Sequence, residues 1–116
     1  PNDLHGTLHY GASWPNNVSS GGSYQVASGS MQDDFHLYTI EWREGEIRWF
    51  FDGFQYARVS QWSTVGHAFP APFDKRFFLI LNVAVGGNWP GSPDATTSFP
   101  QRMEIDYVRV FQENSN

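Results

Sequence analysis

Acidic side chains are the residues of this chain that could carry out acid–base or nucleophilic chemistry. Such chemistry often uses two carboxyl groups that face the same space. Glu44 and Glu46 flank a glycine and are interpreted as solvated turn residues. Glu41 lies on a predicted strand, but no second acid shares its face at a suitable spacing. Asp33 and Asp34 precede a strand and are typical of a turn. We therefore assign no catalytic carboxylate.

Two tryptophans in loops are candidates for ligand binding. Polysaccharide sites are often lined by Trp and Tyr, whose flat faces pack on sugar rings. Trp89 lies in a tight Gly-Asn-Trp-Pro-Gly loop, and Trp14 lies in a similar Ser-Trp-Pro-Asn loop. A packed role remains the alternative for both rings. Asn82 interrupts an apolar run, so its amide is either hydrogen-bonded inside the protein or turned toward a cleft.

Short strands joined by turns are the elements that must position these residues. Alternating or continuous apolar patterns predict strands over residues 6–10, 24–27, 35–43, 47–51, 54–59, 76–85 and 102–112. Residues 11–22 are predicted to be a loop. Asp52-Gly53 predicts a two-residue hairpin turn. Because no window has helical periodicity, the sequence predicts an all-β antiparallel sandwich.

Aromatic residues on the regular strands are interpreted mainly as core. Trp42, Trp49 and Tyr38 recur at alternating spacing, and His36, on the face of Tyr38, is interpreted as a hydrogen-bonded core histidine. His5 and His67 lie in loops and carry no strong signal, and no histidine pair has metal-ligand spacing.

Composition excludes several classes of function. The chain has 116 residues, a formal net charge of −5 and seven scattered basic residues, so nucleic acid is not an expected partner. It has no cysteine, and its longest apolar run is too short to span a membrane. Aromatic residues make up 17% of the chain, which indicates a globular protein rather than a disordered one.

Four motifs in order resemble the C-terminal half of a laminarinase-like enzyme of glycoside hydrolase family 16. They are GTLHYG at residues 6–11 with WPNN at 14–17, DFHLYTIEW at 34–42 with IRWFFDG at 47–53, NVAVGGNWPG at 82–91, and DYVRV at 106–110. The resemblance covers almost the whole chain. It implies one half-domain over residues 1–112 and a tail over 113–116.

The resemblance implies half of a concanavalin-like β-jelly roll, in which a concave sheet forms a glucan cleft. The family's catalytic strand, with glutamates spaced as E-x-D-x-x-E, has no counterpart in this sequence. Its retaining mechanism needs two carboxyl groups about 5–5.5 Å apart. We therefore expect the substrate-binding half of an endo-β-1,3-glucanase, which hydrolyses laminarin only with its N-terminal half. A non-catalytic β-glucan-binding module and a structural β-domain are the alternatives.

The resemblance also implies residue roles. It places Thr7 and His9 on the cleft face of their strand, and it favours Asn82 facing the cleft. With Trp14 and Trp89 these give the expected substrate-binding set of His9, Trp14, Asn82 and Trp89. No cofactor is expected to be required. Many family members carry a structural calcium, and Asp106 matches one carboxylate ligand, but the other ligands would come from the absent half.

Half a jelly roll leaves strand edges unpaired and apolar faces uncovered. We therefore expect the N-terminal half of the same enzyme, as a separate polypeptide, or a second copy of the chain to complete the sandwich. The other expected partner is a β-glucan, with no nucleic acid and no membrane. The first residues do not have the pattern of a signal peptide, whereas the resemblance implies a secreted, extracellular protein.

Overall fold

A computed structural model describes residues 2–27 and 31–113 of this chain. The chain divides into two units, Pro1–Phe77 and Phe78–Asn116, and each is described by itself. The first unit holds all five strands, and the described residues contain no helix: β1 Asp3–Gly11, β2 Asn17–Gln25, β3 Tyr38–Arg43, β4 Glu46–Phe51 and β5 Phe54–Val59. Residues 114–116 of the predicted tail lie outside the described residues, and the half-domain over 1–112 stays a prediction.

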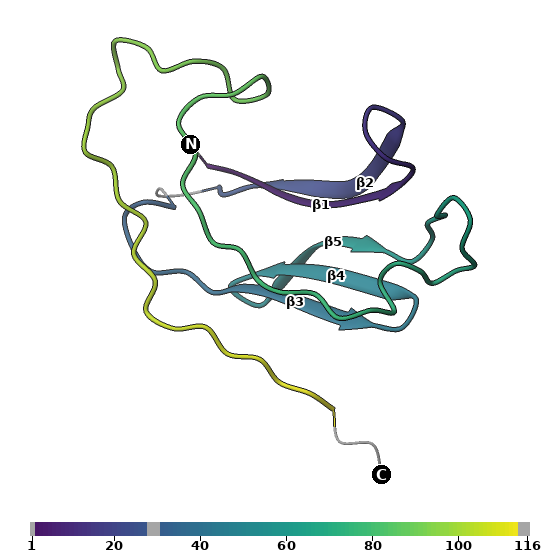
Figure 1. Ribbon diagram of the computed structural model, residues 1–116. Helices are drawn as coiled ribbons and strands as arrows, with labels where there is room; N and C mark the ends of the chain where they lie inside the picture. Colours follow the sequence, from purple (N-terminus) through teal and green to yellow (C-terminus); the bar gives the residue numbers. More distant parts are fainter. Residues whose placement is uncertain (1, 28–30, 114–116) are drawn as a thin grey trace. The chain divides into compact units, whose positions relative to one another are not determined.

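The strands form two antiparallel sheets, as Figure 1 shows. One sheet pairs β1 with β2, from Asp3 opposite Gln25 to Gly11 opposite Asn17. The other has the order β3-β4-β5, with β4 in the middle. The all-β antiparallel fold predicted from the sequence is thus confirmed. Its completion by a partner stays a prediction.

The core lies between the two sheets and alternates along each strand. Leu8 of β1 packs with alternate residues of β4 and β5 and with one tryptophan that follows β5; the buried cluster is Leu8, Ile47, Trp49, Ala57, Val59 and Trp62. Burial of such apolar side chains is the main favourable contribution to folding of this unit. The opposite faces of β1 and β5 carry exposed residues.

Gly6 allows β1 to lie close over the core tryptophan. A Cβ atom at Gly6 would lie 2.6 Å from Cγ of Trp49, closer than side-chain carbons approach one another. Only a glycine therefore fits at this crossing of the two sheets.

The turn between β4 and β5 confirms the hairpin predicted from Asp52-Gly53. The φ angles are 46° at Asp52 and 82° at Gly53, which is the pair of left-handed conformations that a tight hairpin requires. Aspartate and glycine tolerate these angles better than other residues do.

The second strand corrects the prediction of a loop over residues 11–22. Residues 17–25 form β2 along the whole length of β1. The Ser- and Gly-rich sequence has low intrinsic strand propensity, but pairing with β1 and close packing on β5 decide the conformation. Gly22 lies against Ala57 of β5, where an added Cβ would be 3.1 Å from the alanine Cβ.

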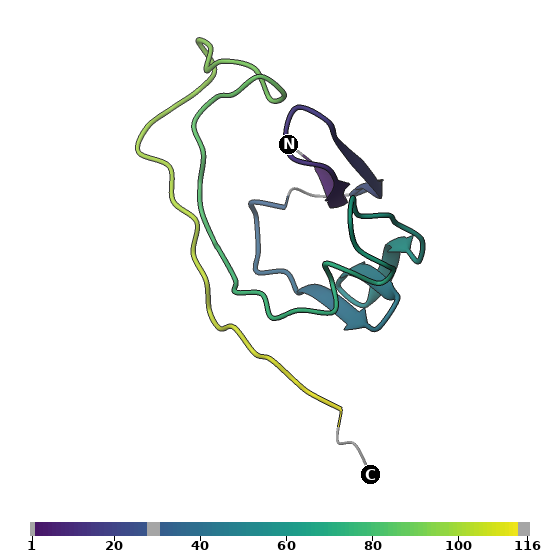
Figure 2. The same cartoon turned by 45° about the vertical axis from the view of Figure 1, so that its right-hand side comes forward.

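The interpretation of the strand aromatics as core is right for one residue and wrong for two. Trp49 is buried, with 8% of its surface exposed, whereas Tyr38 is 56% and Trp42 45% exposed. Both exposed rings lie on β3, which is an edge strand. Residues 73–77 pass beside β3 (Figures 1 and 2), and Trp42 packs edge-on against Phe77 at 5.7 Å between ring centroids.

The second unit has no strand in its described residues, 78–113. The predicted strands over 76–85 and 102–112 are therefore wrong for this structure. A strand is completed by backbone hydrogen bonds to a neighbouring strand. Neither segment has such a neighbour among the described residues. Their large apolar side chains are exposed, among them Phe78, Ile80, Val108 and Val110.

Candidate functional site

His9 lies on the exposed face of β1. Its strand alternates so that Gly6 and Leu8 are buried while Thr7 and His9 are exposed. Across the β1–β2 pair, His9 lies opposite Ser19. Thr7 and His9 therefore share one face of the strand, as predicted from the sequence. Contact with a glucan stays a prediction for this residue.

Trp14 lines a hollow beside the tip of the β1–β2 hairpin. The hollow has a volume of about 700 Å³, and Trp14 is 85% exposed. The hairpin side also contributes Tyr10 and Asn16, and the opposite side consists of residues that follow β5, chiefly Thr64, His67 and Pro72. His9 is not among the lining residues, so the structure does not bring these two predicted site residues together there.

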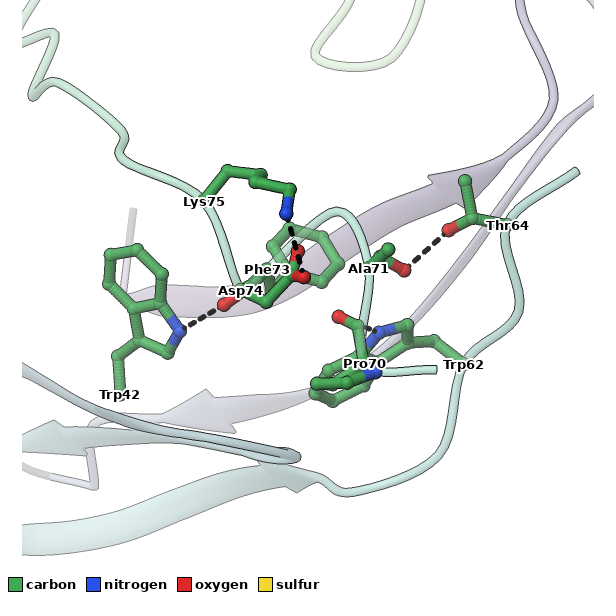
Figure 3. A network of polar contacts seen from close by, with 8 residues as sticks. All are labelled: Trp42, Trp62, Thr64, Pro70, Ala71, Phe73, Asp74 and Lys75. Atoms are coloured by element: carbon green, nitrogen blue, oxygen red, sulfur yellow. Dashed lines mark hydrogen bonds and ion pairs between the residues drawn. The ribbon is translucent and has the colours of Figure 1, made fainter. Parts of the chain in front are cut away.

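Thr64 joins the two walls of this hollow. Its backbone forms bridges with Gly11 and with His67, and the N–H of Val65 donates to the Gly11 carbonyl at 3.1 Å. Its hydroxyl donates to the carbonyl of Ala71 at 2.6 Å (Figure 3). One residue thus fixes the hairpin tip, the 64–67 turn and the 71–72 segment relative to one another.

Two indole groups also hold the segment of residues 70–73. Figure 3 shows the Nε1–H of Trp62 donating to the Pro70 carbonyl at 2.9 Å and that of Trp42 donating to the Phe73 carbonyl at 2.8 Å. The Trp62 ring also packs against Phe69 and Phe73, at centroid distances of 4.8 and 5.3 Å. Sequence reasoning missed this arrangement, because residues 60–75 show only an irregular, proline-containing pattern.

A second hollow, of about 360 Å³, lies beside the end of β3. It is lined by Trp42 and Phe73 together with the charged residues Arg43, Glu44, Asp74 and Lys75. The Lys75 ammonium lies 3.0 Å from the Asp74 carboxylate. This pair of neighbours keeps the local charge balanced, and no sequence pattern marked the place.

Asn82, Trp89 and Asp106 belong to the second unit, and each is exposed there. Trp89 is 76% exposed and lies in a turn closed by the Gly91 N–H, which donates to the Gly87 carbonyl at 3.0 Å. The tight loop expected around Trp89 is therefore present. Roles in binding stay predictions for all three residues.

Asp106 alone cannot hold the calcium that the resemblance implies. Calcium takes six or more oxygen ligands. Within residues 2–27 and 31–113, no three His, Cys, Asp or Glu side chains gather as a metal site. The residues present therefore do not fit the ion by themselves.

Glu46 corrects the interpretation of a solvated turn residue. It begins β4, lies 2.5 Å from Arg48 and also pairs with Arg58 of β5. The hydrogen bond from Arg58 is the main cause that holds the pKa of the Glu46 carboxyl below its usual range. Glu41 adds a longer contact of 3.6 Å to Arg48. These contacts assign Glu46 a cross-strand structural role rather than a proton-transfer role.

Asp52 holds the segment before β3 against the hairpin turn. One carboxylate oxygen accepts from the Leu37 N–H at 2.8 Å, and the other lies 2.7 Å from Nδ1 of His36. The hydrogen bond from the Leu37 N–H is the main cause that lowers the pKa of the Asp52 carboxyl, and the hydrogen bond with His36 lowers it further. His36 packs on Phe51 and is only partly buried. The sequence predicted a hydrogen-bonded histidine at this position but did not identify Asp52 as its partner.

These features together define an antiparallel β-sandwich with polar and aromatic residues on the outer face of β1 and at its tip. The chain belongs to glycoside hydrolase family 16, because the profile described as "Glycosyl hydrolases family 16" matches residues 2–109. The described residues contain no helix that could cross a lipid bilayer.

Curated relatives agree with this family. The chain is 44% identical, over 97% of its length, to glucan endo-1,3-beta-glucosidase A1 of Niallia circulans. It is 38% identical, over 97% of its length, to a beta-glucanase of Rhodothermus marinus. It is also 35% identical, over 81% of its length, to a beta-1,3-glucan-binding protein of Penaeus monodon. No solved structure gave a significant match.

The chain spans only part of these relatives. It covers 17% of the Niallia protein, 40% of the Rhodothermus protein and 30% of the Penaeus protein. The segment that matches is therefore a fraction of each longer protein.

Proposed function

We propose that this chain is the glucan-binding half of an endo-β-1,3-glucanase. The observation that carries the proposal is the 44% identity, across 97% of the chain, to a relative named glucan endo-1,3-beta-glucosidase A1. The exposed Thr7–His9 face of β1 supports it, because this face is free to meet a ligand. The substrate class is β-glucan, of the laminarin type.

Four exposed residues are assigned to glucan contact. His9 offers a ring nitrogen to sugar hydroxyls, and Asn82 offers an amide. Trp14 and Trp89 offer flat apolar faces on which sugar rings pack. All four are exposed, which supports the assignment because a binding residue must be accessible.

Hydrolysis is assigned to the chain only in combination with its N-terminal half. A retaining glycosidase uses two carboxyl groups about 5–5.5 Å apart. The sequence has no E-x-D-x-x-E motif, and the Glu46 and Asp52 carboxylates are engaged in ion pairs and hydrogen bonds. The partner half would supply the acid and the nucleophile.

Laminarin tests the proposal in two measurements. The purified chain is expected to release no reducing sugar from laminarin, yet to be retarded in a gel that contains laminarin. Trp89→Ala is expected to lose much of that retardation, whereas Phe99→Ala, a change of another exposed aromatic ring, is expected to keep it. Sugar release by the chain alone would refute the half-enzyme, and equal retardation of the two variants would refute Trp89 as a binding residue.

A non-catalytic glucan-binding module is the second candidate. The relative from Penaeus monodon, named beta-1,3-glucan-binding protein, favours it. Retardation by laminarin with no sugar release from the longer protein that contains this segment would support the module over the enzyme. Absence of both would leave a structural β-domain.

The proposed site of action is outside the cell, because a polymeric glucan does not cross a membrane. Recovery of the protein from the medium rather than from the cells is the outcome that fits this location.

A further inference from the structure

The hollow beside the hairpin tip has room for a sugar ring and the chemistry to bind one. Its volume of about 700 Å³ lies within the range of small-molecule sites. Trp14 and Tyr10 supply aromatic surface on the hairpin side. Asn16, Thr64 and His67 supply groups that can donate or accept hydrogen bonds. Apolar ring faces beside polar edges are what a pyranose presents to a protein.

The walls of the hollow are held in place before any ligand arrives. Thr64 bridges the backbones of Gly11 and His67, and its hydroxyl donates to Ala71. The indole of Trp62 also donates to the Pro70 carbonyl, as Figure 3 shows. Binding therefore needs little ordering of these loops, which lowers the entropic cost of association.

Charge is what distinguishes this hollow from the one beside β3. Among the described residues that line it, none is Asp, Glu, Lys or Arg. A sulfated or carboxylated sugar would lose hydration there without gaining a cationic partner. A neutral sugar loses less hydration, and its hydroxyls can hydrogen-bond to the polar side chains of the hollow.

We propose that this hollow is a subsite for one uncharged pyranose ring of the glucan and discriminates against anionic glycans. Trp14 is the platform, Asn16, Thr64 and His67 are the hydroxyl partners, and the absence of fixed charge sets the preference. The inference rests on the proposed function, since it takes the glucan as the ligand. It adds the location of the subsite, its residues and its selectivity.

Titration calorimetry with laminarin and with sulfated laminarin tests the subsite, because the two polymers share one backbone. The chain is expected to bind laminarin at least ten-fold more tightly than its sulfated form. Trp14→Ala is expected to weaken laminarin binding by about ten-fold. Phe35→Ala removes another exposed aromatic ring, which lies outside the hollow, and is expected to leave binding unchanged.

His67→Lys is the complementary variant, because it places a fixed cation in the hollow. It is expected to reduce or abolish the preference for laminarin over sulfated laminarin. Circular dichroism of each variant checks that the fold is retained, which the exposure of residues 14, 35 and 67 favours.

The outcomes separate this subsite from the function on which it rests. No binding of laminarin by the parent chain would refute both. Binding that is the same in Trp14→Ala and Phe35→Ala, or equal affinity of the parent chain for the two polymers, would refute the subsite and leave the glucan-binding half intact.

Discussion

The Asp52 carboxylate connects two parts of the chain that are distant in sequence. It accepts a hydrogen bond from the N–H of Leu37, 15 positions away in sequence, and pairs with His36, 16 positions away. Because its own residue forms the tight β4–β5 turn, one side chain fixes both the turn and the segment that leads into β3. Burial is the main cause that raises the pKa of the Tyr38 phenol, and the negative charge of Asp52 raises it further.

Asp52→Asn is expected to destabilise the fold at neutral pH. Asparagine tolerates the left-handed turn, so the variant isolates the charge. The folded-state pKa of Asp52 lies below its unfolded value. The contribution of its charge to the free energy of unfolding is therefore present above the unfolded pKa and is lost as pH falls through the folded pKa. Because the carboxylate is half exposed, the loss in free energy of unfolding is about 1 kcal/mol or less.

Urea unfolding of both proteins at pH 7 and at pH 2–3 measures this difference. The gap between parent and variant should close at the acidic pH. A gap that persists unchanged there would show that the charge of Asp52 is not its source.

Predictability at the residue scale depended on whether a residue's role is set locally. The Asp52-Gly53 turn follows from local backbone preference and was predicted. The indole donors of Trp42 and Trp62 act on carbonyls 31 and 8 positions away. Nothing in the spacing of these residues indicates such contacts, because carbonyl groups are present at every position of a chain.

At the scale of elements, the contact of β1 with β4 leaves no room for a side chain at one position of β1. Gly6 lies against the ring of buried Trp49 with no room for a methyl group. Overpacking of a buried contact typically costs about 1–3 kcal/mol. The sheet spacing at this point therefore depends on one missing side chain.

Gly6→Ala is expected to lower the free energy of unfolding by about 1–3 kcal/mol. Urea denaturation measures the change, and Thr7→Ala, on the exposed face of the same strand, is the matched control with little expected effect. The double variant Gly6→Ala, Trp49→Phe should recover part of the overpacking loss. A Gly6→Ala protein as stable as the parent would contradict the close approach.

Strand prediction succeeded where the pattern and the pairing agreed. Residues 47–51 and 54–59 alternate clearly and pair through a local turn, so β4 and β5 were predicted almost to the residue. Residues 17–25 lack the pattern but have a partner, and they form β2. Residues 78–85 have the pattern but no described partner, and they form no strand. Pairing, which a single sequence does not display, decided the last two cases.

At the scale of the whole molecule, the described residues expose many large apolar side chains. Large hydrophobic side chains are exposed on β3 and through residues 77–111, where segments predicted as strands have no partner. Unpaired apolar segments of this kind promote association. We propose that a partner covers them, either the N-terminal half of the enzyme or a second copy of the chain.

Sedimentation of a well-folded sample tests this proposal. The expected mass is larger than the 13.2 kDa of one chain, with dissociation on dilution if the partner is a second copy. Adding the N-terminal half as a separate polypeptide should replace the homo-oligomer with a complex of one copy of each. A folded, cooperative species of 13.2 kDa at all concentrations would refute the need for a partner.

The three donors that hold residues 70–73 all recognise main-chain carbonyls. A carbonyl is the same whichever side chain its residue carries. The course of this segment is therefore specified in part from outside, by Trp42, Trp62 and Thr64. Substitutions at neighbouring exposed positions such as Asp74 and Lys75 can alter the charge of the hollow beside β3 while the backbone keeps its path. The charge of that hollow can thus change in evolution on an unchanged scaffold.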